Sequence, residues 1–97
     1  MKRIILSNDG DSLIYSVPDI VAENLEKYCL KFLNWLYNNK PKKYWINGAM
    51  CFGTDDFIDY LNDLFPNEQS KFLLNIGWTN LDENIPEKYK DLPYFIF

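Results

Sequence analysis

The chain has 97 residues, of which 47% are hydrophobic and 25% charged, with a formal net charge of −4 at pH 7. This length and balance predict one globular domain over residues 1–97, because a disordered chain would be poorer in apolar residues. The acidic balance argues against direct DNA or RNA binding, and no apolar run approaches the roughly 20 residues that span a bilayer.

Histidine is absent, which removes the usual partner of a nucleophilic serine or cysteine. Cys29 and Cys51 are the two cysteines, and they lie among apolar neighbours without the spacing of a metal site. We therefore expect free thiols, no cofactor, no metal ligand, no catalytic residue and no enzymatic activity. The N-terminal segment is too polar for a signal-peptide core, which predicts a cytoplasmic protein.

Residues 3–16 are predicted to form an antiparallel hairpin, because Asp9-Gly10 lies between two apolar runs and suits a type I′ turn. In that register, residues that face each other have numbers that sum to 19. Strand alternation then divides the side chains into two faces. The face expected to meet the core carries Ile4, Leu6, Leu13 and Tyr15, and the other carries Ile5 and Ile14.

A long helix is predicted from Pro18 to Asn39, with proline in its first turn and an Asn-Asn pair before the next proline. Its apolar residues follow helical spacing and form one wide stripe. Leu30 and Tyr37 fall outside this stripe, as ordinary exposed residues or as part of a surface that faces a partner. Residues 44–51 are predicted to form a second hairpin, with Asn47-Gly48 at its turn.

The segment "GTDDFIDYLNDLF" predicts a helix from residue 54 to residue 65, with Thr54 as its N-cap. Four aspartates share its polar face: Asp55, Asp56, Asp59 and Asp63. The simplest interpretation is helix capping plus exposure to solvent. A protein partner or a hard cation such as Mg²⁺ is the alternative use of these carboxylates.

Residues 66–77 are predicted to form a shorter helix that ends at Gly77, followed by an irregular loop and a C-terminal strand over residues 94–97. The predicted fold class is α+β. A small, mostly antiparallel sheet, made of the N-terminal hairpin and the C-terminal strand, packs against one long helix and two shorter helices. The helices are expected to cover one face of this sheet.

Aromatic residues make up 18% of the chain, which is more than a core of this size is expected to hold. Exposed tyrosine and tryptophan anchor protein interfaces, because they combine a large apolar ring with a polar tip. We expect a protein partner to contact an aromatic patch beside the acidic helix. The aromatic residues assigned to this surface are Tyr37, Trp45, Trp78 and Tyr89.

The stretches "SVPDIVAENLEKYC", "INGAMCFGTDDFIDYLN" and "FPNEQS" resemble small proteins of phages and gut bacteria that have no assigned function. The resemblance contains no motif with known chemistry. It implies a protein that inhibits a host or defence factor in the host cytoplasm, or a minor virion or regulatory component.

The sequence therefore predicts a non-enzymatic protein-binding module, in its narrowest form a phage-encoded inhibitor of a host or defence protein. The first alternative is a homo-oligomeric structural or assembly component that pairs edge strands such as the C-terminal one. The second is a small carboxylate-dependent metal binder or enzyme built on the four aspartates.

Overall fold

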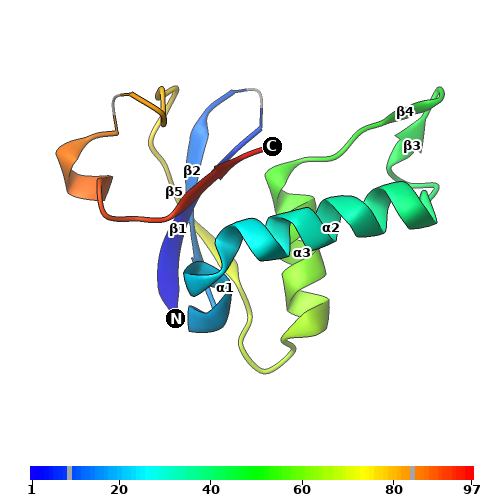
Figure 1. Ribbon diagram of the computed structural model, residues 1–97, viewed down its shortest axis with the longest axis horizontal. Helices are drawn as coiled ribbons and strands as arrows, with labels where there is room; N and C mark the ends of the chain where they lie inside the picture. The colour runs from blue at the N-terminus through cyan, green and yellow to red at the C-terminus, as the bar shows by residue number, and fades with distance from the viewer. Residues whose placement is uncertain (9, 84) are drawn as a thin grey trace.

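The computed structural model describes residues 1–8, 10–83 and 85–97, and it confirms the predicted α+β fold (Figure 1). A four-stranded sheet has the order β5-β2-β1-β6, in which β6 runs parallel to β1 and the other pairs are antiparallel. In chain order the elements are β1 (Lys2–Ser7), β2 (Ser12–Val17), α1 (Asp19–Glu23), α2 (Leu25–Asn39), β3 (Trp45–Ile46), β4 (Ala49–Met50), α3 (Thr54–Leu64), β5 (Lys71–Asn75), a 3₁₀ turn (Glu87–Tyr89) and β6 (Tyr94–Ile96).

The register of the first hairpin is confirmed. The pairs run from Lys2 opposite Val17 to Ser7 opposite Ser12, and the numbers of each pair sum to 19. The turn residue Asp9 lies outside the described residues. Because side chains alternate along a strand, this register gives the sheet two apolar faces.

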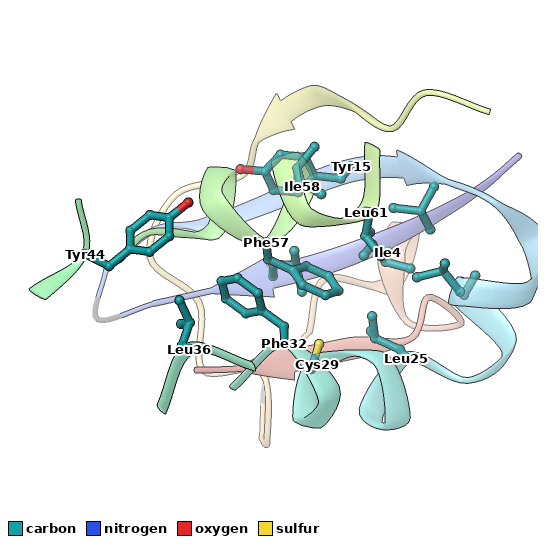
Figure 2. Close-up of a cluster of buried hydrophobic side chains, with 14 residues drawn as sticks. Ile4, Tyr15, Leu25, Cys29, Phe32, Leu36, Tyr44, Phe57, Ile58 and Leu61 are labelled. Atoms are coloured by element: carbon teal, nitrogen blue, oxygen red, sulfur yellow. The ribbon is translucent and has the colours of Figure 1, made fainter. Parts of the chain in front are cut away.

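The main core lies between one face of the sheet and the helices α2 and α3, which both lie on that face (Figure 2). Ile4, Phe32, Leu36 and Phe57 are completely buried there. Each such side chain stabilises the fold by about 1.5–3 kcal/mol relative to exposure. Cys29 is also completely buried, and this burial raises the pKa of its thiol well above the ordinary value.

The helices cover one face of the sheet as predicted, and the second face is covered by the segment that the sequence predicted as an irregular loop. Ile5 and Ile14 are buried against Leu81 and Tyr89, and these residues belong to the segment that leads from β5 to β6. That segment has no helical or strand period, so its apolar residues gave no pattern that predicts a covering layer. The isoleucines of the hairpin nevertheless need cover, because an exposed apolar face of that size is unfavourable.

The predicted long helix is divided into α1 and α2 at Asn24, whose backbone leaves the helical region (φ −134°, ψ 41°). The Asn24 side chain donates a hydrogen bond to the Ile20 carbonyl (2.9 Å), which satisfies one of the acceptors at the end of α1. α2 ends as predicted before Pro41, with Lys40 in the left-handed region (φ 44°).

Residues 71–75 form a strand, so the prediction of a helix over residues 66–77 was wrong. The Asn62 side chain accepts a hydrogen bond from the Ser70 N–H (2.6 Å) and donates one to the Ser70 carbonyl (3.2 Å), which fixes the chain at the start of β5. The strand then pairs with β2, and a bulge at Leu73 interrupts the register. Pairing with an available sheet edge therefore outweighed the helical spacing of the apolar residues.

The second hairpin is confirmed, with Trp45 opposite Met50 and Ile46 opposite Ala49. Asn47 (φ 52°) and Gly48 (φ 79°) both have the positive φ that a type I′ turn requires. These two strands form a separate ribbon beyond the end of α2 (Figure 1).

Candidate interaction surfaces

The acidic helix α3 begins after Gly53, so the prediction of Thr54 as its N-cap was wrong. Gly53 is the N-cap, and the Asp56 carboxylate accepts a hydrogen bond from the Gly53 N–H (2.7 Å), which gives that backbone donor a partner. Thr54 is the first helical residue, and its buried hydroxyl shares a hydrogen bond with the Tyr15 hydroxyl (2.8 Å). Burial raises the pKa of Tyr15, and the bond to Thr54 offsets part of this effect.

Three of the four predicted aspartates are exposed on α3, namely Asp55, Asp59 and Asp63, while Asp56 is half-buried. They lie along one helix face and do not converge on a point. Among residues 1–8, 10–83 and 85–97, no group of three or more His, Cys, Asp or Glu side chains is arranged to hold a metal ion.

The four predicted aromatic contacts do not form one patch. Tyr37 on α2 and Trp78 after β5 are 55% and 77% exposed, and Trp45 is half-buried with the Lys40 ammonium 5.3 Å from its ring centre. The end of α2 and the β3–β4 ribbon lie on the opposite side of the sheet from the segment that follows β5 (Figure 1). Tyr89 is buried in the second core, so its assignment to an exposed surface was wrong.

The aromatic surplus is explained instead by a network of rings inside the molecule. Phe32 contacts the rings of Phe52, Phe57, Tyr60 and Phe97 at centroid distances between 5.3 and 6.1 Å. Tyr44 is 94% buried, and Trp35 packs edge-on against its ring. The core therefore holds more of the aromatic residues than we expected for a chain of this size.

The most apolar exposed element is the strand β5, which the sequence did not identify as a surface. Every residue of β5 is exposed, and its apolar residues Phe72, Leu73 and Leu74 are 55%, 41% and 45% exposed. Three consecutive apolar residues are compatible with either a helix or a strand. No other feature of the sequence indicated that Phe72, Leu73 and Leu74 would lie at the edge of a sheet.

β5 is the outer strand of the sheet on its side, and within residues 1–8, 10–83 and 85–97 it pairs with β2 alone. An outer strand has a row of backbone N–H and C=O groups that point away from the sheet. Phe72 packs edge-on against the Tyr15 ring (5.8 Å between centroids), which supports the strand on the side of the main core. At the other end, the Asn75 side chain donates a hydrogen bond to the Asp11 carboxylate (3.0 Å).

Comparisons of the chain with known protein families, with curated proteins and with solved structures find no match. No helix in the described ranges is both long enough and apolar enough to cross a membrane.

Proposed function

We propose that the protein is a non-enzymatic protein-binding module that adds an extended apolar segment of a partner protein to the outer edge of β5. The observation that carries this proposal is the exposure of three consecutive apolar residues, Phe72 to Leu74, on a strand whose outer backbone has no pairing strand in the described part of the chain. In strand addition the backbone groups supply hydrogen bonds and the side chains supply specificity.

The composition of the β5 edge is unusual for a surface that stays in water. Soluble proteins commonly protect an edge strand with charged residues or proline, and β5 has Lys71 as its only charged residue. The bulge at Leu73 twists the strand and limits open-ended stacking of further strands. A partner that covers this edge would remove apolar surface from water at roughly 25 cal/mol per Å².

The test is capture of partners from lysate of the cells that encode the protein, with the wild type and two matched variants. Leu73→Lys places a charge on the β5 edge, and Leu30→Lys places the same charge at an equally apolar, 47% exposed site on α2. We expect a specific protein to be captured by the wild type and by the Leu30→Lys variant but not by the Leu73→Lys variant. Equal capture by all three proteins would contradict binding at β5.

A second candidate function, self-assembly, is favoured by the charges at the two ends of β5. An antiparallel pair of β5 strands centred on Leu73 would bring Lys71 of each copy to the end of the pair where the other copy holds the Asp11 carboxylate, which accepts a hydrogen bond from Asn75. The edge is therefore complementary to itself in charge as well as in apolar content. Two five-residue strands bury less than the roughly 800 Å² per partner of a standard interface, so the expected dissociation constant is on the order of 100 μM.

Sedimentation at concentrations around this value tests self-assembly with two charge variants. Lys71→Glu and Asp11→Lys each bring like charges together at both ends of the pair and should weaken association. An equimolar mixture of the two variants brings opposite charges together and should restore it. A monomeric wild type, or a mixture no stronger than the separate variants, would contradict this candidate.

The narrower expectations stay predictions. Inhibition of a host or defence protein, which the resemblance implies, is one use of the proposed surface. Cytoplasmic localisation and the alternative of a carboxylate-dependent metal binder or enzyme likewise stay predictions.

A further inference from the structure

We infer that the opposite edge of the sheet, at β6, is a second binding site that takes an extended segment of a partner with two adjacent basic residues. This inference is independent of the proposed role of β5, because it depends on different residues and on a different kind of partner. The relevant features are the direction of the β6 backbone, the shape of the groove beside it and the charges that line this groove.

Only alternate residues of β6 use their backbone groups to pair with β1 in the described part of the chain. The Pro93 carbonyl accepts a hydrogen bond from the Ile5 N–H, and the Phe97 N–H donates one to the Ser7 carbonyl, both at 2.9 Å. Backbone groups of successive residues in a strand point to opposite sides, so residues 93, 95 and 97 face β1. The N–H and C=O groups of Tyr94 and Ile96 therefore point outward, where the described part of the chain has no further strand.

A shallow groove of about 390 Å³ follows this outer edge. Its floor is the strand from Tyr94 to Ile96, and its two charged lining residues are both carboxylates, Glu26 from α2 and Asp82 from the segment after β5. α2 packs on one face of the sheet and the segment after β5 covers the other. An added strand would therefore have one carboxylate on each side of it.

This arrangement selects the charge and the spacing of the ligand. Adjacent residues of an extended segment project to opposite faces, so two consecutive basic residues would meet Glu26 and Asp82 respectively. The neighbouring hollow of about 430 Å³ is lined by Trp78 and Ile96, both exposed, and it offers an aromatic face on which an arginine can stack. An acidic segment would meet like charge on both sides and is excluded.

Backbone pairing also favours an extended partner over a helical one. The outward groups belong to alternate residues, Tyr94 and Ile96, and this spacing matches the hydrogen-bonding pattern of a neighbouring strand. The Tyr94 hydroxyl donates a hydrogen bond to Asp82 (3.0 Å), which holds that carboxylate beside the strand before a ligand arrives.

The experiment is a titration of the isotope-labelled protein with two blocked hexapeptides of β-branched residues, one with two central arginines and one with two central glutamates. We expect the arginine peptide to bind, to shift and protect the amides of Tyr94 and Ile96, and to change the fluorescence of Trp78. Higher ionic strength should weaken this binding. No binding by the arginine peptide, or equal binding by both peptides, would overturn the inference.

A pair of charge variants separates this site from general attraction by an acidic protein. The Glu26→Gln/Asp82→Asn double variant removes both charges that line the groove, at exposed positions. It should lower the affinity for the arginine peptide roughly ten-fold. The control, Asp59→Asn/Asp63→Asn, removes two charges from α3 and should leave the affinity unchanged. Equal weakening by both double variants would overturn the inference, and neither result depends on what binds β5.

Discussion

The two edges of the sheet differ in how they are held and in what they expose. β6 is short, and its central residue Phe95 and the following Phe97 turn into the main core, where their ring centres lie 5.0 Å apart. β5 is longer, but all its residues are exposed and its main aromatic contact is that of Phe72 with Tyr15. One edge is therefore anchored by its side chains and lined by acid, whereas the other is held mainly by its backbone and is apolar.

Because of this difference, we expect substitutions at β6 to affect mainly stability and substitutions at β5 to affect mainly binding. A residue whose ring is buried at β6 contributes to the free energy of unfolding, so its loss is felt by the whole molecule. A residue exposed at β5 contributes little to folding and is free to serve a partner. The effects of substitutions at the two edges should therefore differ in kind as well as in size.

The largest expected effect is a difference in unfolding free energy between alanine substitutions at the two edges. Phe97→Ala removes a half-buried ring that contacts Phe32, Phe52 and Phe57, and should lower the free energy of unfolding by about 2–4 kcal/mol. Phe72→Ala removes a mostly exposed ring and should cost about 1 kcal/mol or less. Urea denaturation of both variants measures this, and equal losses would show that β5 is anchored as firmly as β6.

A smaller effect is expected where the chain enters β5. Asn62→Ala removes both hydrogen bonds to the backbone of Ser70 and should lower the free energy of unfolding by about 1–3 kcal/mol. Asn62→Asp keeps the acceptor for the Ser70 N–H and should retain part of that stability. Hydrogen exchange should be faster over β5 than over β6 in the alanine variant. Uniform acceleration over both strands would contradict a local role for Asn62.

A weaker effect is expected from pH, which changes the stability contributed by the Tyr94–Asp82 hydrogen bond at the β6 edge. The hydrogen bond to Asp82, together with the negative charge of that residue, raises the pKa of Tyr94 above its ordinary value of 10.0. The resulting stabilisation is present below pH 10 and is lost as the pH rises through the raised pKa. An NMR titration of the Tyr94 ring should show the raised pKa, and Asp82→Asn should lower it towards 10.0. An unchanged pKa in that variant would contradict the assignment.

The smallest effect is expected for a substitution on the polar face of α3, which belongs to neither edge strand. Asp59→Asn removes repulsion with the exposed carboxylates four residues before and after it, Asp55 and Asp63. The free energy of unfolding should rise by about 0.2–0.5 kcal/mol per pair at low salt. Thermal denaturation at low and high ionic strength measures this. Marked destabilisation would show that Asp59 has a structural partner.

Local patterns predicted much of the fold correctly. The Asp-Gly and Asn-Gly pairs in the sequence predicted the location and register of two hairpins, because a hairpin turn depends on a few residues close in sequence. The β5 strand was missed because Phe72 to Leu74 fit a helix equally well. Its pairing with β2 depends on Asn62 and Tyr15, which are distant in sequence.

The candidate surfaces were harder to predict than the fold. Exposure of an aromatic residue depends on which segment covers it, so Tyr89 and Trp78, both in the irregular segment before β6, have opposite surroundings. The acidic face of α3 followed from helical spacing and was predicted correctly. The carboxylates of Glu26 and Asp82 are brought together by tertiary packing, and their spacing in sequence gives no sign of it.

Site-specific photo-crosslinking in the cells that encode the protein tests directly whether a partner binds at β5. A photoreactive phenylalanine analogue replaces Phe72 on β5 in one protein and the equally exposed Tyr37 on α2 in another. We expect a specific crosslinked species from position 72, either to a second copy or to one other protein, and none from position 37. Specific crosslinks from position 37 alone, or none from position 72, would contradict the proposal that β5 is the binding edge.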